Sequence, residues 1–95
     1  MIIVAGHLRV EPRNRETYLR SCIEVARIAR ATPGCIDFRL SPDPIDDDRI
    51  NVFEQWESVE AVEAFRGADS SSDLDGAIIE AVVLQHEIAS STPLT

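Results

Sequence analysis

Two side chains in the stretch FEQWES, residues 53–58, have the chemistry of a functional site: Glu54 and Trp56. They are two residues apart, so in a β-strand they would lie on the same face. A carboxyl group on a buried face is desolvated, which disfavours its charged form and suits it to accept a proton from a bound substrate. The indole of Trp56 offers a flat surface against which an aromatic ring can stack.

Both residues also have an ordinary structural interpretation. Glu54 could pair with an arginine or with backbone donors as a structural contact, because buried acids are uncommon unless they are paired or used. Trp56 could be a core residue. The sequence leaves these alternatives open, and one observation separates them. A pocket on this face either reaches Glu54 or is filled by Trp56 and Phe65.

Metal binding is not indicated by the remaining candidate ligands. His7 and His86 fall on predicted strands, and no third ligand is spaced to join them. Asp46, Asp47 and Asp48 resemble calcium ligands by composition, but the glycine and terminal glutamate of an EF-hand loop are missing. We therefore predict no metal site, an interface position for His7, and a solvated hairpin tip for the three aspartates.

Three other side chains have reactive or polar groups. Tyr18 lies on the predicted first helix, where its hydroxyl could orient a phenolic substrate or could lie at a rim in contact with water. Cys22 and Cys35 are spaced neither as a CxxC redox pair nor as a zinc site, so we interpret them as reduced, small hydrophobic residues. No glycine-rich phosphate loop is present, which argues against a nucleotide cofactor.

Length and charge narrow the functional classes. The chain has 95 residues, a net charge of -8 and a pI near 4.5, with 44% hydrophobic and 27% charged residues. This composition is typical of one soluble domain whose core is small enough to benefit from a partner chain. The negative charge argues against nucleic acid and anionic membranes as partners. The opening MIIVAGHL resembles no signal peptide, so we expect a cytoplasmic protein.

Hydrophobic periodicity predicts the elements that must position Glu54 and Trp56. Alternation predicts strands, helical spacing after Pro12 predicts a helix that stops at Pro33-Gly34, and Ser58 is the expected N-cap of a helix through Phe65. A short helix is expected near 73–80, and the tail 90–95 is expected to fray. The predicted strands are 2–10, 35–41, 50–58 and 81–89.

The predicted order is βαββαβ, for which the common solution is a ferredoxin-like α+β fold in a single domain spanning 1–95. It has a four-stranded antiparallel sheet with both helices on one face. The other face is mixed, neither apolar enough for a core nor polar enough for open water. Such a face suggests a second copy packed sheet to sheet, that is, a homodimer. It would carry Ala5, His7, Arg9, Phe53 and Gln55.

The element order, the PGC turn at 33–35 and the Glu-x-Trp-x-Ser pattern of FEQWES together resemble the antibiotic biosynthesis monooxygenase (ABM) family. The resemblance covers Ile2 to about Ile88. It implies a dimeric α/β barrel in which each protomer has a pocket between its sheet and its helices. Trp56 matches the tryptophan of that pocket. Because such folds host several chemistries, the resemblance defines the fold more closely than the reaction.

The resemblance also bears on haem. In the haem-degrading branch the tryptophan is joined by an asparagine on the first strand and by a haem-ligating histidine on the helix after the third strand. Here these positions fall at Leu8 and at or beside Phe65. The resemblance therefore implies that haem is not bound. Quinol-oxidising and polyketide-tailoring members often have a histidine at the same helix position, so Phe65 departs from their pattern as well.

The leading hypothesis is a cofactor-independent monooxygenase that oxidises a small electron-rich aromatic substrate, such as a quinol, an anthrone or a related polyketide, with O2 as co-substrate. Glu54 would accept a proton and Trp56 would hold the ring. The alternative is a non-enzymatic dimeric protein of the same fold that binds a small molecule and uses Glu54 as a structural acid. The other predicted substrate-binding residues are Leu8, Tyr18, Val52 and Phe65.

Overall fold

The computed structural model describes residues 1–68 and 77–95. Its elements follow the predicted order βαββαβ, and their bounds are close to those expected from the sequence. None of the helices in these two segments is long and apolar enough to span a membrane. The elements are β1 (Ile2–Val10), α1 (Pro12–Ala31), β2 (Cys35–Pro42), β3 (Arg49–Trp56), α2 (Val59–Ala68) and β4 (Ile78–Glu87).

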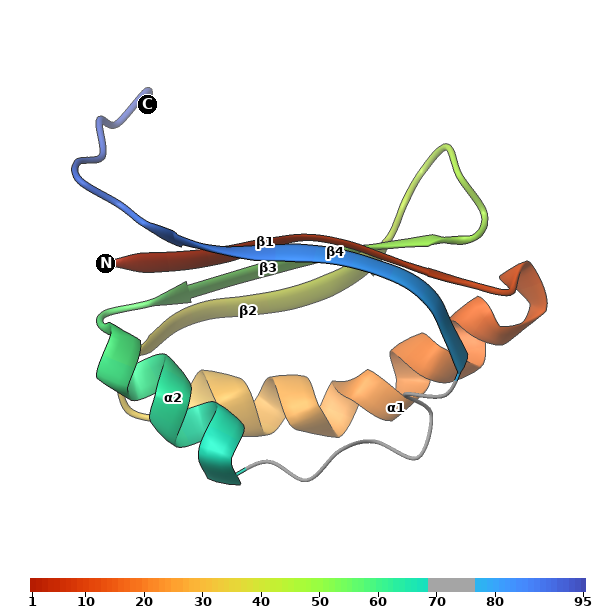
Figure 1. The fold of residues 1–95 in the computed structure, drawn as a ribbon, viewed down its shortest axis with the longest axis horizontal. Helices are drawn as coiled ribbons and strands as arrows, with labels where there is room; N and C mark the ends of the chain where they lie inside the picture. The colour runs from red at the N-terminus through yellow and green to blue at the C-terminus, as the bar shows by residue number, and fades with distance from the viewer. Residues whose placement is uncertain (69–76) are drawn as a thin grey trace.

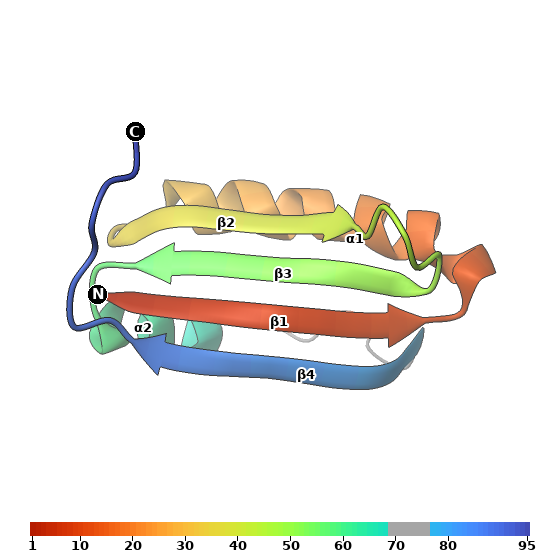
Figure 2. The same cartoon turned by 90° about the horizontal axis from the view of Figure 1, so that it is seen from above.

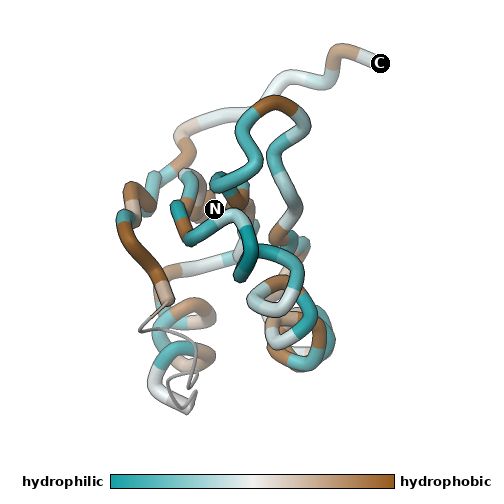
Figure 3. Tube along the Cα trace, turned by 90° about the vertical axis from the view of Figure 1, so that its right-hand side faces the viewer, coloured by the Kyte–Doolittle hydropathy of each residue, from teal (hydrophilic) through white to brown (hydrophobic). Residues whose placement is uncertain are grey.

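The strands form one antiparallel sheet in the order β2-β3-β1-β4, so β1 and β3 are central and β2 and β4 are edges (Figure 2). Both helices lie on the same side of this sheet (Figure 1). In the view turned by 90°, the two helices are separate coils that lie side by side below the strands (Figure 3). The predicted ferredoxin-like α+β fold is confirmed.

Local signals explain where the helices begin and how α1 leads into the next strand. Pro12 occupies the first turn of α1, where its missing N–H leaves no intrahelical hydrogen bond unmade. The hydroxyl of Ser58 accepts a hydrogen bond from the backbone N–H of Ala61 at 3.2 Å, which confirms Ser58 as the cap of α2. Gly34 has a φ of +88°, which allows the sharp turn from α1 into β2.

Alternate residues of the two central strands form the core. In β3 the buried positions are Ile50, Val52, Glu54 and Trp56, as period-two alternation predicts. The core divides into two clusters on the helix side of the sheet. One contains Ile2, Val4, Ala29, Phe38, Trp56, Val62 and Phe65, and the other contains Leu8, Val10, Tyr18, Ile50 and Val52.

Two expectations about the second half of the chain need correction. Residues 78–80 begin β4, so the short helix expected near 73–80 is wrong there, and its positions 73–76 lie outside the described residues. The last strand starts three residues before the expected 81 for the same reason. Ile78 and Ile79 are β-branched residues that favour an extended backbone, and the helical interpretation underweighted them.

The hairpin between β2 and β3 agrees with the predicted solvated tip at Asp47, which is exposed, while Asp46 and Asp48 are half-buried. Asp43 accepts hydrogen bonds from the backbone N–H of Asp46 at 2.9 Å, the side-chain amide of Asn51 at 2.9 Å and the backbone N–H of Ile45 at 3.1 Å. These bonds lower the pKa of Asp43 to about 2. Asp48 accepts a hydrogen bond from Arg9 on β1 at 2.8 Å. Asp43 therefore holds the hairpin together, and Asp48 fastens it to β1.

Gly6 lies in the middle of β1 with a φ of +157°. A Cβ atom at this position would overlap the carbonyl oxygen of Val82 on the adjacent β4. Only a residue without a side chain lets the two backbones approach this closely.

We expect Gly6→Ala to lower the free energy of unfolding by about 2 kcal/mol or more, because the new methyl group must displace backbone rather than a flexible side chain. Gly67→Ala is the matched control, since nothing lies within 4 Å of its added Cβ. That change should raise stability by about 0.5–1 kcal/mol through helix propensity. Urea unfolding of both variants measures the difference, and equal stabilities would contradict the close β1–β4 approach.

Candidate functional site

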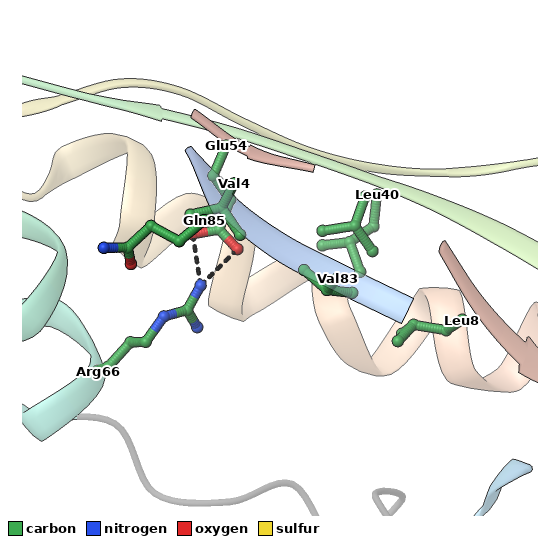
Figure 4. A pocket seen from close by; sticks show the side chains of 8 residues that line it. Val4, Leu8, Leu40, Glu54, Arg66, Val83 and Gln85 are labelled. Atoms are coloured by element: carbon green, nitrogen blue, oxygen red, sulfur yellow. Dashed lines mark hydrogen bonds and ion pairs between the residues drawn. The ribbon is translucent and has the colours of Figure 1, made fainter. Parts of the chain in front are cut away.

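A pocket of about 400 Å³ opens on the helix side of the sheet (Figure 4). Its floor comes from all four strands, and α2 supplies one side. Helix α1 packs mainly against the edge strand β2, which leaves the central part of the sheet uncovered by that helix. The described residues that line the pocket are Val4, Leu8, Leu40, Val52, Glu54, Arg66, Val83 and Gln85.

Strand register arranges this floor in rows. Val4 on β1 pairs with Glu54 on one side and with Gln85 on the other, so the polar groups of the floor share one row. In the next row Gly6 lies between Val52 and Val83 and adds no side chain. The floor is therefore polar at one end, apolar over the rest, and free of side-chain bulk at Gly6.

Glu54 is the buried acid of this site, with only 3% of its surface exposed. Its Oε1 accepts a hydrogen bond from the indole N–H of Trp56 at 3.0 Å. Arg66 donates from Nη2 to both carboxylate oxygens at 2.8 Å, as the dashed lines in Figure 4 show. A buried carboxylate needs a counter-charge and hydrogen bonds to offset its lost hydration, and here it has both.

Arg66 was not singled out in the sequence. Its side chain reaches from α2 to the pocket and is 50% exposed, so one part is in water while the guanidinium contacts the buried acid. A signal was available: Val62 and Phe65 form the apolar stripe of α2, and residue 66 flanks that stripe at the edge facing the sheet. The predicted alternative that Glu54 pairs with an arginine is therefore confirmed as a contact.

Trp56 and Phe65 are not among the described residues that line this pocket, and their contact with a substrate stays a prediction. Trp56 is fully buried, and its ring lies 5.2 Å from that of Phe65, centroid to centroid. The rings of Phe65 and Phe38 meet edge to face, with their centroids 5.7 Å apart. These rings pack as core beyond the Glu54 end, and Trp56 reaches the site through its hydrogen bond to Glu54.

Of the other three residues predicted to bind substrate, two line the pocket and one does not. Leu8 and Val52 are in the pocket wall. Tyr18 is buried in the cluster around Ile50 and Val10, not among the described lining residues, because α1 turns that face onto the sheet. Of its two predicted roles, the rim position in water is therefore wrong, and the orienting of a substrate stays a prediction.

The described parts of the chain hold no group of three or more His, Cys, Asp or Glu side chains placed to bind a metal. His7 lies on the opposite sheet face, 3.6 Å from Glu80. Burial raises the pKa of the Cys35 thiol, and the negative charges of Glu54 and Asp37 raise it further. A thiol in this environment stays protonated and is a poor nucleophile.

Comparison with known proteins identifies the family. The sequence model for antibiotic biosynthesis monooxygenases matches residues 1–74, which is most of the chain. The chain belongs to the ABM family. A curated relative, the uncharacterized protein sll1783 of Synechocystis, is 29% identical over 62 residues, which cover 65% of this chain and 42% of that protein. The chain thus spans less than half of the length of this relative.

Solved structures similar to this ABM-family chain share its fold. A candidate antibiotic biosynthesis monooxygenase from Deinococcus radiodurans has a TM-score of 0.82 at 15% identity, covering 100% of this chain and 99% of its own. The protein PA3566 from Pseudomonas aeruginosa has a TM-score of 0.81 at 18% identity, covering 94% of each chain.

The haem degrader MhuD from Mycobacterium tuberculosis, solved with two haems in its active site, has a TM-score of 0.70 at 18% identity. That comparison covers 98% of this chain and 100% of MhuD. At such low identities these likenesses show the ABM fold and leave the chemistry to the residues of the pocket.

Proposed function

We propose that this protein is a cofactor-independent monooxygenase that oxidises a small phenolic aromatic, such as a quinol or an anthrone, with O2. The observation that carries the proposal is the carboxylate of Glu54, which lies with Arg66 and Gln85 at the polar end of a pocket of about 400 Å³ whose other lining residues are apolar. That volume lies within the range of small-molecule sites, and one convergent polar end is typical of them. Membership of the ABM family supports the same reaction class.

The reaction begins with a proton transfer. Glu54 accepts the proton of the substrate hydroxyl, or of the enol form of an anthrone, and leaves an electron-rich anion in the pocket. Leu8, Val52 and Val83 give the ring an apolar surface against which to pack. The protein thus supplies a base and an apolar surface that holds the ring, and the electrons come from the substrate.

Oxygen is the oxidant in the second stage. For an anthrone, the anion transfers one electron to O2, and the resulting radical pair combines into a carbon-bound peroxide that takes a proton back from Glu54. Loss of the remaining proton on that carbon, with cleavage of the O–O bond, forms the ketone and releases hydroxide, which leaves as water. One oxygen atom enters the product and the other enters water, so no external reductant is needed.

Glu54→Gln tests the role of the acid, because the amide keeps the volume but cannot accept the proton. We expect oxygen uptake with an active quinol or anthrone to fall by about a hundred-fold or more, the usual effect of losing a positioned general base. Glu57→Gln, an exposed acid three residues away, is the control and should keep the parent rate. Parent-like turnover by Glu54→Gln would refute the proposed base.

A second candidate function is a non-enzymatic dimeric binding protein for a small molecule. The observation in its favour is that the described structure already satisfies Glu54, through Trp56 and Arg66, as a structural acid would be satisfied. The two functions differ in one measurement. A binding protein would hold quinols or anthrones in calorimetry and consume no oxygen with any of them.

We propose that haem is not the cofactor, because the side chains present do not fit it. No described residue that lines the pocket is a histidine, cysteine, methionine or tyrosine able to ligate iron. His7 and His86 both belong to the outer face of the sheet, where His86 pairs with Ile3. Stoichiometric haem should produce no sharp Soret shift, and a saturable spectrum of an axial histidine would overturn this proposal.

We further propose a homodimer through the outer face of the sheet. No helix among the described residues covers this face (Figure 1), and its β4 residues Val82 and Leu84 are 46% and 58% exposed beside His7 and Ala5. Such partly apolar surface on a small domain is typical of an interface. ABM proteins are generally small dimers, which supports the same arrangement.

Sedimentation at micromolar concentration should give twice the 10.5 kDa chain mass. Leu84→Asp should shift the equilibrium towards monomer, because it places an unpaired charge in the interface. Arg27→Asp on the outward side of α1 is the control and should sediment like the parent protein. A parent protein that sediments as a monomer would contradict the proposed dimer.

A further inference from the structure

Arg66 has more hydrogen-bonding capacity than its contact with Glu54 uses. A guanidinium group has five N–H donors in one plane. Only Nη2 contacts the carboxylate, and Nη1 and Nε make no hydrogen bond or ion pair with a described residue. Figure 4 shows the second terminal nitrogen turned away from the carboxylate. Arg66 can therefore bind a second oxygen atom without first leaving Glu54.

We propose that Arg66 stabilises the substrate anion and restricts the pocket to neutral weak acids; this inference rests on the proposed function. When the substrate O–H bond breaks, its proton forms an O–H bond on Glu54 and the negative charge moves to the substrate oxygen. The positive charge of Arg66 then faces that oxygen instead of the neutralised carboxyl group. Arg66 is thus a further catalytic residue.

Charge balance is the physical reason for this division of roles. Before the transfer the site holds one carboxylate, one guanidinium and a neutral hydroxyl, and afterwards it holds a neutral acid, the same guanidinium and an oxyanion. The net charge of the site stays at zero throughout. An apolar pocket penalises any net charge strongly, so a transfer that creates none avoids most of that cost.

The same balance defines the class of substrate. A ligand that arrives as an anion, such as an aromatic carboxylate, would place two negative charges around the single guanidinium of Arg66. A phenol or enol arrives neutral and gives up its proton inside the site. The net charge of -8 on the chain further disfavours anionic ligands. We therefore expect selection for weakly acidic hydroxyl groups on apolar aromatic bodies.

Kinetics of Arg66→Gln and Arg66→Lys test the catalytic role. We expect Arg66→Gln to lower kcat by about a hundred-fold or more with little change in KM, because the lost interaction acts on the charge of the anion. Arg66→Lys keeps the charge and should recover part of the rate. Arg27→Gln, at an exposed ion pair on α1, should behave like the parent protein. An unchanged kcat in Arg66→Gln would overturn the role.

Binding tests the substrate class without any turnover, so its failure is distinct from failure of the proposed oxidation. 2-Naphthol and 2-naphthoate share a ring system, but at pH 7 the first is neutral and the second is an anion. Calorimetry should show at least ten-fold tighter binding of naphthol. The indole N–H resonance of Trp56, the single tryptophan of the chain, should shift on binding because this group donates to Glu54.

Equal or tighter binding of naphthoate would overturn the inference, and so would failure of both compounds to bind or binding that leaves the Trp56 resonance unmoved. The comparison uses the parent protein, so it decides the question even if Arg66→Gln does not fold.

Discussion

A carboxylate with 3% exposure can stay in a protein interior only if other groups replace its water. In this protein that requirement falls on Glu54 and joins strand β3 to helix α2. Strand β3 supplies the acid and the indole donor of Trp56, which lies two residues after Glu54. Helix α2 supplies Arg66, which lies twelve residues after Glu54. The pairing constrains how α2 lies against the sheet, and with it the wall of the pocket.

The pocket exists because neither helix α1 nor a side chain at position 6 fills the middle of the sheet. The helix side of the sheet is filled at the end of Trp56, where its ring packs against that of Phe65, and at the far end, where Tyr18 packs among aliphatic side chains. Between them α1 covers mainly β2, and Gly6 contributes no side chain to the floor. The result is an apolar hollow whose polar groups, Glu54, Arg66 and Gln85, gather at one end. This polarity is what a weakly acidic aromatic needs.

Periodicity in the sequence was sufficient for the fold and for one half of the site. Alternation in β3 placed Glu54 and Val52 on the buried face, and Ser58 marked the start of α2 correctly. The alternation of buried and exposed residues could not tell whether Trp56 faces a pocket or the core, because the pocket and the core lie on the same side of the sheet. The partner of Glu54 was harder to predict. The apolar stripe of α2 places residue 66 beside the sheet, but which strand residue it meets depends on tertiary packing.

The central claim is that a phenolic ligand binds in this pocket with its hydroxyl between Glu54 and Arg66. The most direct test is a crystal structure with 2-naphthol, which has the phenolic hydroxyl of a substrate but neither the second hydroxyl of a quinol nor the CH2 group of an anthrone. The account predicts the naphthol oxygen within hydrogen-bonding distance of both the Glu54 carboxyl group and Nη1 of Arg66, with its rings against Leu8 and Val52. Naphthol bound with its hydroxyl away from Glu54, or only on the outer face of the sheet, would contradict it.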